Sequence, residues 1–224
     1  MVDYLIELLI GLPCVIVALT FHELAHGFIA YKLGDPTAKI MGRLTLNPLK
    51  HLDPLGTVSM IFFKFGWAKP VPIDTRYFRK PRRDIALTAL AGPLANLLLA
   101  FVGAFIFSLF DFLVKVPALE YGSFLFWVVY ACYNILLSFA WLNIALALFN
   151  LIPLPPLDGS RILLIWLPYR IYAKILRYER EIAAMFLVLL LLDSRILGGY
   201  LSSGLSFLVN LIFNGMLSLF SLIF

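Results

Sequence analysis

The chain has 224 residues, of which 62% are hydrophobic and only 14% are charged, and its mean hydropathy is +0.95. An ordinary soluble domain is about 45–50% apolar and about 25% charged, so this composition excludes a water-soluble enzyme and a disordered chain. The formal net charge of +5 suits the basic loops that orient a membrane protein, and we expect no nucleic acid partner. The sequence therefore predicts one membrane-embedded domain over residues 1–224 in a lipid bilayer.

Five apolar runs are candidates for membrane-spanning helices, because a span needs about 20 mostly apolar residues. They are Tyr4–Tyr31, Ile85–Phe110, Tyr121–Leu157, Ile182–Leu192 and Ile196–Phe224. The third run is too long for one simple span and ends in a proline-rich stretch, and the fourth is a span only if flanking residues extend it. Because the first basic residue is Lys32, the N-terminus lacks a signal-peptide pattern, and we expect the first run to remain in the mature protein.

The basic residues are distributed unevenly between the loops. Eleven lie between the first and second runs, five follow the third run, and the two remaining loops hold one each. Because Lys and Arg accumulate in cytoplasmic loops, this bias places the two basic loops in the cytoplasm and the N-terminus outside. The compact length favours a prokaryotic cell membrane.

The region Ile40–Ile73 is apolar but is interrupted repeatedly by Gly and Pro, which excludes a long helix. Within it, Arg43–Leu46 and Thr57–Phe63 have the composition of short strands. We therefore expect a β or re-entrant region that packs on protein at the membrane. Arg161–Tyr178 mixes large apolar residues with spaced Arg and Lys, which is typical of an interfacial helix. The predicted fold is an all-α polytopic membrane protein with about five transmembrane helices and this short β region.

The segment His22-Glu23-Leu24-Ala25-His26 lies near the predicted cytoplasmic end of the first apolar run. On a helix, His22 and His26 project from the same face, so their imidazoles can bind one Zn²⁺. Glu23 lies near that face and can accept a proton from the attacking water, as in the HExxH pattern of zinc peptidases. The alternative is a pair of histidines that hydrogen-bond neighbouring helices, with Glu23 as their ion partner. Each ionisable residue within a span costs about 2.5–3.5 kcal/mol on insertion scales, which favours the metal site.

A catalytic zinc usually has three protein ligands, so a third must come from elsewhere in the chain. Asp158 directly follows the third apolar run and emerges on the same predicted side as the histidines. It could instead cap the N-terminus of the following helix. His51 is the competing ligand, although a solvated surface histidine is the ordinary expectation for it. The topology favours Asp158 without excluding His51.

The His22–His26 motif, together with Asn150–Gly159 (NLIPLPPLDG), resembles the site-2 proteases, which are intramembrane zinc metalloproteases. Further matches are Gly42–Pro48, Asp53–Thr57, Gly66–Pro72 and Ala91–Asn96. The resemblance runs from about Phe21 to Arg161 and is to the compact members, which lack a PDZ or CBS domain.

The resemblance implies that Asp158 is the third ligand of one Zn²⁺ per chain and that Glu23 is the catalytic base. It also implies that Asn150 faces the active site and binds substrate or the oxyanion, although Asn150 could instead satisfy backbone groups at a helix end. Asn96 is a second tentative substrate residue, which could instead brace its helix against a neighbour.

The implied activity is regulated intramembrane proteolysis, with transmembrane segments of other proteins as substrates. Two alternatives stay open. The first is a membrane zinc protease that cuts peptides at the cytoplasmic surface and uses a Glu as its third ligand. The second is a non-proteolytic membrane protein that binds or carries zinc.

Overall fold

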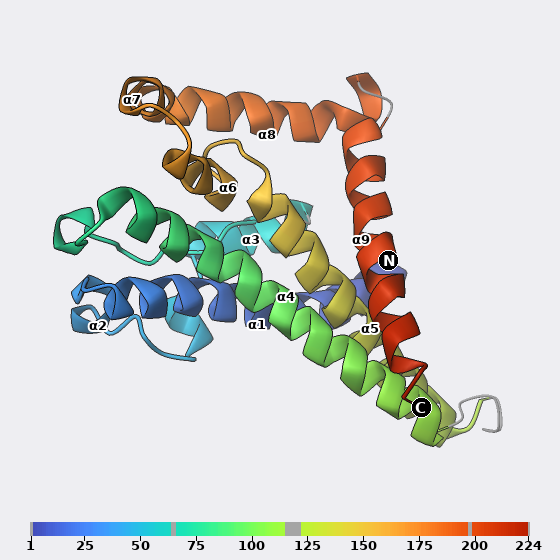
Figure 1. Ribbon diagram of the computed structural model, residues 1–224. Helices are drawn as coiled ribbons and strands as arrows, with labels where there is room; N and C mark the ends of the chain where they lie inside the picture. The colour runs from blue at the N-terminus through green and yellow to red at the C-terminus, as the bar shows by residue number, and fades with distance from the viewer. Residues whose placement is uncertain (1, 64–65, 115–121, 197–198, 224) are drawn as a thin grey trace.

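Four long helices form the body of the molecule in the computed structural model, which describes residues 2–63, 66–114, 122–196 and 199–223 (Figure 1). They are α1 (Val2–Lys32), α4 (Pro81–Val114), α5 (Phe124–Leu151) and α9 (Tyr200–Phe220). Each contains a segment that is long and apolar enough to cross a membrane. The prediction of a helical, multi-pass membrane protein is therefore confirmed.

Shorter helices fill the connections, and the described residues form no sheet. The α-helices among them are α2 (Thr37–Ile40), α3 (Pro54–Phe63), α6 (Asp158–Ile162), α7 (Tyr169–Arg177) and α8 (Glu179–Ile196). Turns of 3₁₀ helix occur at η1 (Pro48–Lys50), η2 (Thr75–Tyr77) and η4 (Leu163–Ile165). Most of these short elements lie in the two basic loops that the charge pattern predicts.

The long helices pack closely where their side chains are small. α4 packs along α5 and across α1, and α9 packs against α5 and α4. Ala100 and Ala104 on α4 and Ala140 on α5 are fully buried, and residues of this size let membrane helices approach one another. Ile144 and Val209 fill the space between them. Van der Waals packing therefore joins α4, α5 and α9 into one core.

Most of the predicted apolar runs match the long helices. Tyr4–Tyr31 lies within α1 and Ile85–Phe110 lies within α4. The run that begins at Tyr121, which is outside the described residues, gives α5. This helix ends at Leu151, where prolines begin to interrupt the chain.

The predicted span Ile182–Leu192 lies within α8, which is not one of the four candidate membrane spans among the described residues. Charged residues stand at both ends of this 18-residue helix, so its uninterrupted apolar stretch is shorter than a span requires. In Figure 1, α8 runs across the end of α9. The count of about five spans is therefore not confirmed.

Both strands predicted in the region after α1 are wrong. Thr57–Phe63 belongs to α3, and Arg43–Leu46 forms a bend. The Asp53 carboxylate accepts a 2.9 Å hydrogen bond from the Gly56 backbone N–H, and Pro54 is the first residue of α3. An Asp cap followed by proline is a strong start for a helix, and here it outweighs the strand preference of the residues that follow.

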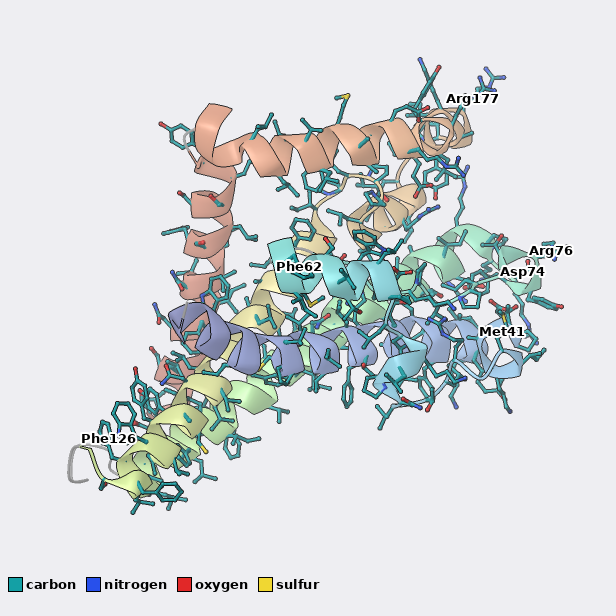
Figure 2. The ribbon with its side chains drawn as sticks, turned by 180° about the vertical axis from the view of Figure 1, so that it is seen from behind. Met41, Phe62, Asp74, Arg76, Phe126 and Arg177 are labelled. Carbon is teal, nitrogen blue, oxygen red and sulfur yellow. The ribbon has the colours of Figure 1, made fainter. Side chains whose placement is uncertain are left out.

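Residues 66–74 form an irregular segment that is tied to the loop following α1. The buried Arg43 donates a 2.6 Å hydrogen bond from Nη2 to the carbonyl oxygen of Lys69. The buried Asp35 carboxylate accepts a 2.7 Å hydrogen bond from the Asp74 backbone N–H. Figure 2 shows Asp74 at the same end of the molecule as the C-terminal end of α1. These contacts hold the segment against the end of α1.

The predicted interfacial helix Arg161–Tyr178 is not one helix but consists of the end of α6, the turn η4 and α7. Pro168 directly precedes α7, and a proline cannot continue a helix from the preceding turn. α7 keeps an amphipathic pattern, because Arg170 and Lys174 are exposed whereas Tyr172 is buried. Its place at a membrane surface stays a prediction.

Replacing Asp53 with alanine should loosen α3, because the Gly56 N–H loses its acceptor. We expect a loss of about 1 kcal/mol in local stability, and therefore about fivefold faster amide hydrogen exchange over residues 54–63. Exchange measured by mass spectrometry checks this, with Asp53→Asn as the control that keeps the cap. Equal exchange in Asp53→Ala and the unmodified chain would contradict the capping explanation.

Candidate metal centre

α1 presents His22 and His26 on the side that faces α4. The two residues are one helical turn apart, and both are buried, at 6% and 7% exposed. Their Nε2 atoms lie 3.0 Å apart. The two imidazoles therefore converge, as the HExxH spacing predicts.

Gly92 is where the backbone of α4 comes against these imidazoles. A Cβ atom at this position would lie 2.5 Å from Nε2 of His26 and 2.6 Å from Nε2 of His22, which is too close for non-bonded atoms. Glycine therefore leaves the room that two imidazoles need between α1 and α4. Gly92 is a site residue that the metal-ligand patterns do not predict, although a glycine inside an uncharged span is a signal of close helix approach.

Hydrogen bonds at Nδ1 orient both histidines. Nδ1 of His26 lies 2.7 Å from the carbonyl oxygen of Thr88, and Nδ1 of His22 lies 2.6 Å from Oδ1 of Asn96. Both oxygens can only accept, so each Nδ1 donates, and in the neutral ring each Nε2 then carries the lone pair. Two lone pairs 3.0 Å apart repel each other unless a cation lies between them, which is the arrangement of metal-ligating imidazoles.

Asp158 brings a third acceptor to the same point. Its Oδ2 lies 3.1 Å from Nε2 of His22 and 3.3 Å from Nε2 of His26. This oxygen is buried without a hydrogen-bond partner. Three acceptor atoms therefore face one point, which is the arrangement that suits a bound cation.

The turn after α5 places Asp158 here. A proline-rich turn follows Leu151, and Gly159 then packs against the carbonyl groups of Leu151 and Ile152, where a side chain would not fit. Asp158 is the first residue of α6, and no side chain caps that helix. The N-cap alternative for Asp158 is therefore not what the structure shows.

Glu23 faces a different neighbour from the two histidines. It is 9% exposed, and its Oε2 accepts a 2.9 Å hydrogen bond from the backbone N–H of Val71 in the 66–74 segment. Gly27, one turn further along α1, allows this contact, because a Cβ atom there would lie 3.1 Å from Cγ1 of Val71. Glu23 therefore projects beside the histidines, and its carboxylate is held by a backbone amide.

A cavity of about 810 Å³ opens at the site. Among its lining residues are His22, His26, Glu23 and Asp158, together with residues of the 66–74 segment and apolar side chains of α8. Asn150 also lines it, and its Nδ2 donates a 3.0 Å hydrogen bond to the carbonyl oxygen of Leu146. The cavity is within the usual size range of ligand pockets, about 300–1,000 Å³.

Asn96 and His51 lie away from the cavity wall. Asn96 is fully buried and contacts Nδ1 of His22, on the side of the ring opposite Nε2. This position fits the bracing alternative rather than contact with a substrate. His51 is fully buried, and its Nε2 donates a 2.8 Å hydrogen bond to the Thr45 carbonyl oxygen. The expectation of a solvated His51 is wrong, and the candidate ligand cluster found among the described residues contains Asp158 instead.

Comparison with known proteins identifies the family. Residues 127–192 match the model of Peptidase family M50. "Putative zinc metalloprotease YwhC" of Bacillus subtilis is 44% identical over 193 residues, which cover 84% of each chain.

The chain belongs to peptidase family M50.

More distant members of the family match a smaller part of the chain. "Putative zinc metalloprotease Rip2" of Mycolicibacterium smegmatis is 32% identical over 150 residues, which are 64% of this chain and 52% of that protein. "Putative zinc metalloprotease MJ0611" of Methanocaldococcus jannaschii is 29% identical over 152 residues, which are 66% and 65% of the two chains. No solved structure matches. The resemblance to site-2 proteases is confirmed, and the chain is a membrane metalloprotease.

The family implies zinc, and the residues present fit that ion. Two imidazole nitrogens and one carboxylate oxygen lie within 4.8 Å of one another, and they are the ligand types that Zn²⁺ prefers. The unpartnered Oδ2 of Asp158 is explained once a cation occupies this point. His22, His26 and Asp158 are therefore a candidate zinc site.

Replacing Gly92 with alanine should weaken zinc binding, because the added methyl group meets both Nε2 atoms. We expect a loss of about 10-fold to 100-fold in zinc affinity, as is found when the surroundings of metal ligands are changed. Metal content and chelator competition on the detergent-purified chain measure it. Gly204→Ala is the control, since a Cβ atom there meets nothing within 4 Å. Unchanged zinc affinity in Gly92→Ala would show that the imidazoles do not need this space.

Proposed function

We propose that this chain is an intramembrane zinc endopeptidase of the HExxH type, which hydrolyses peptide bonds within or near transmembrane segments of other proteins. The observation that carries the proposal is the convergence of His22, His26 and Asp158 at a cavity that also contains Glu23. Membership of a metalloprotease family supports it. Its cellular role would be regulated intramembrane proteolysis.

One Zn²⁺ per chain would be held by Nε2 of His22, Nε2 of His26 and a carboxylate oxygen of Asp158. When bound, zinc supplies Lewis acidity, which polarises a peptide carbonyl and lowers the pKa of water. The two Nδ1–H groups, bonded to Thr88 and Asn96, keep both imidazoles in the tautomer that can bind the ion.

Glu23 is the general base of the proposed reaction. The Val71 N–H holds Oε2, and Oε1 stays available to take the proton of the attacking water and pass it to the leaving amine. The role of Asn150 at the cavity wall, as a donor to substrate or oxyanion, is part of the same proposal.

The proposed substrate lies in the cavity between the 66–74 segment and α8. Apolar side chains of α8, including Phe186 and Leu187, line one wall, which suits the side chains of a transmembrane segment. The irregular backbone of residues 66–74 borders the cavity, where it can pair with a substrate that has left its helical form. Substrates with helix-weakening residues near the cut should therefore be preferred.

The proposed location is the cell membrane of a prokaryote, with the N-terminus outside and the active site toward the cytoplasm. The support is the excess of Lys and Arg in the loops that follow α1 and α5. The histidines lie in the half of α1 that leads into the first of these basic loops.

Glu23→Gln separates a protease from a zinc carrier. Glutamine keeps an oxygen that can accept from the Val71 N–H, but it cannot take a proton. We expect zinc content to be unchanged and cleavage of a single-span model substrate in proteoliposomes to fall by about 10²–10⁴-fold. Glu181→Gln on α8 is the control and should cleave normally. A carrier would show no effect of the Glu23 change on its activity.

Asp158→Ala tests the third ligand. We expect the purified chain to lose most of its bound zinc, because two imidazoles alone hold the ion weakly. His51→Gln, which keeps a donor for the Thr45 carbonyl group, should retain zinc. Metal analysis of both variants decides the assignment, and the reverse result would make His51 the ligand.

A further inference from the structure

We infer that Asn143 of α5 is a positioning residue that fixes the tautomer of His22, although it touches neither the ligand atoms nor the cavity. The inference rests on the proposed zinc site. It assigns part of that site to α5, a helix that also lines the cavity with Leu146, Phe149 and Asn150.

Three hydrogen bonds connect a backbone carbonyl group of α5 to His22. Nδ2 of Asn143 donates to the carbonyl oxygen of Phe139 at 2.9 Å. Nδ2 of Asn96 donates to Oδ1 of Asn143 at 2.8 Å. Nδ1 of His22 then donates to Oδ1 of Asn96 at 2.6 Å. Asn96 and Asn143 are both 0% exposed, so water does not supply alternative partners.

The Phe139 carbonyl group determines which atom donates in each of these three hydrogen bonds. An asparagine amide can turn over and exchange its oxygen for its nitrogen, so its own shape does not determine what it offers a neighbour. The Phe139 carbonyl group has no such freedom, because it only accepts. It therefore holds the nitrogen of Asn143, which leaves the oxygen of Asn143 to hold the nitrogen of Asn96. The oxygen of Asn96 is then left for His22.

His26 shows why His22 needs this arrangement. The Nδ1 atom of His26 bonds directly to the Thr88 carbonyl oxygen, and a backbone carbonyl group sets its tautomer without help. His22 meets a side-chain amide, whose nitrogen is held by Asn143 at 2.8 Å and otherwise only by a long 3.4 Å contact with the Ala18 carbonyl oxygen. The two zinc ligands thus reach the same tautomer by different routes.

Loss of the Asn143 amide leaves Asn96 poorly oriented. Its remaining partner is the Ala18 carbonyl oxygen, at a long 3.4 Å from Nδ2. If the Asn96 amide turns over, its NH₂ group faces Nδ1 of His22, which must then accept. The ring proton moves to Nε2, and that nitrogen can no longer bind a metal ion.

The test is the zinc affinity of Asn143→Leu in the full-length, detergent-purified chain, measured by chelator competition, with the visible absorption of bound Co²⁺ as a second readout. Leucine has nearly the shape of asparagine and removes the amide. We expect zinc affinity to fall about 10-fold to 100-fold and the Co²⁺ spectrum to change. Asn143→Ala is the second variant, in case leucine prevents folding, and carries the same expectation.

Trp141→Phe is the matched control. It removes another side-chain hydrogen bond of α5, the 2.9 Å bond from Trp141 Nε1 to Oδ1 of Asn210 on α9, and should leave zinc affinity unchanged. The unfolding temperature of the zinc-free variants separates the two roles. If Asn143 only braces α5, Asn143→Leu and Trp141→Phe will both lose stability and both keep zinc affinity, which would overturn the inference.

A rescue distinguishes orientation from packing. Asn96→Asp offers His22 an oxygen whichever way its side chain turns, so Asn143 is no longer needed. We therefore expect Asn143→Leu to cost little zinc affinity in the Asn96→Asp background. An equal loss in both backgrounds would overturn the inference while leaving the zinc site intact. An unmodified chain that binds no zinc would instead overturn the proposed function, and this inference with it.

Discussion

The arrangement of the site depends on three electron-pair donors that lie close together in apolar surroundings. No hydrogen-bond donor of the described residues lies between them. Two imidazole nitrogens and the Asp158 carboxylate are mutually unfavourable at distances of 3.0–3.3 Å unless one cation binds all of them. Two features bring these atoms together. One is the close approach of α4 at Gly92, and the other is the turn after α5 that places Asp158 beside the histidines. A bound metal ion would explain why a membrane protein of such low charge content keeps this costly arrangement.

Two faces of α1 contact different parts of the molecule at the site. His22 and His26 meet α4 across Gly92, whereas Glu23, one residue further round the helix, meets the 66–74 segment across Gly27. Successive residues of a helix point about 100° apart, so one short motif reaches two different neighbours. The side that carries the two histidines is packed against α4. The Glu23 carboxylate is held by the 66–74 segment, which Arg43 and Asp35 in turn hold by hydrogen bonds.

The sequence predicts the long helices and the candidate ligand cluster because these leave local signals: apolar runs, the one-turn spacing of the histidines, and the place of Asp158 directly after an apolar run. It fails where a local preference is outweighed by a contact. The strand composition of Thr57–Phe63 is outweighed by the Asp53–Pro54 helix start, which is itself visible in the sequence. The burial of His51 and the contact of Asn143 with Asn96 have no local signal, because they join residues that only the fold brings together.

The ligands come from parts of the chain that are far apart: two from α1 and one from the start of α6. During synthesis, α1 leaves the ribosome first, and more than half of the chain must follow before Asp158 emerges. A nascent chain or an early truncation product therefore holds only two of the three proposed ligands. The proposed site can therefore assemble only after translation has passed the start of α6.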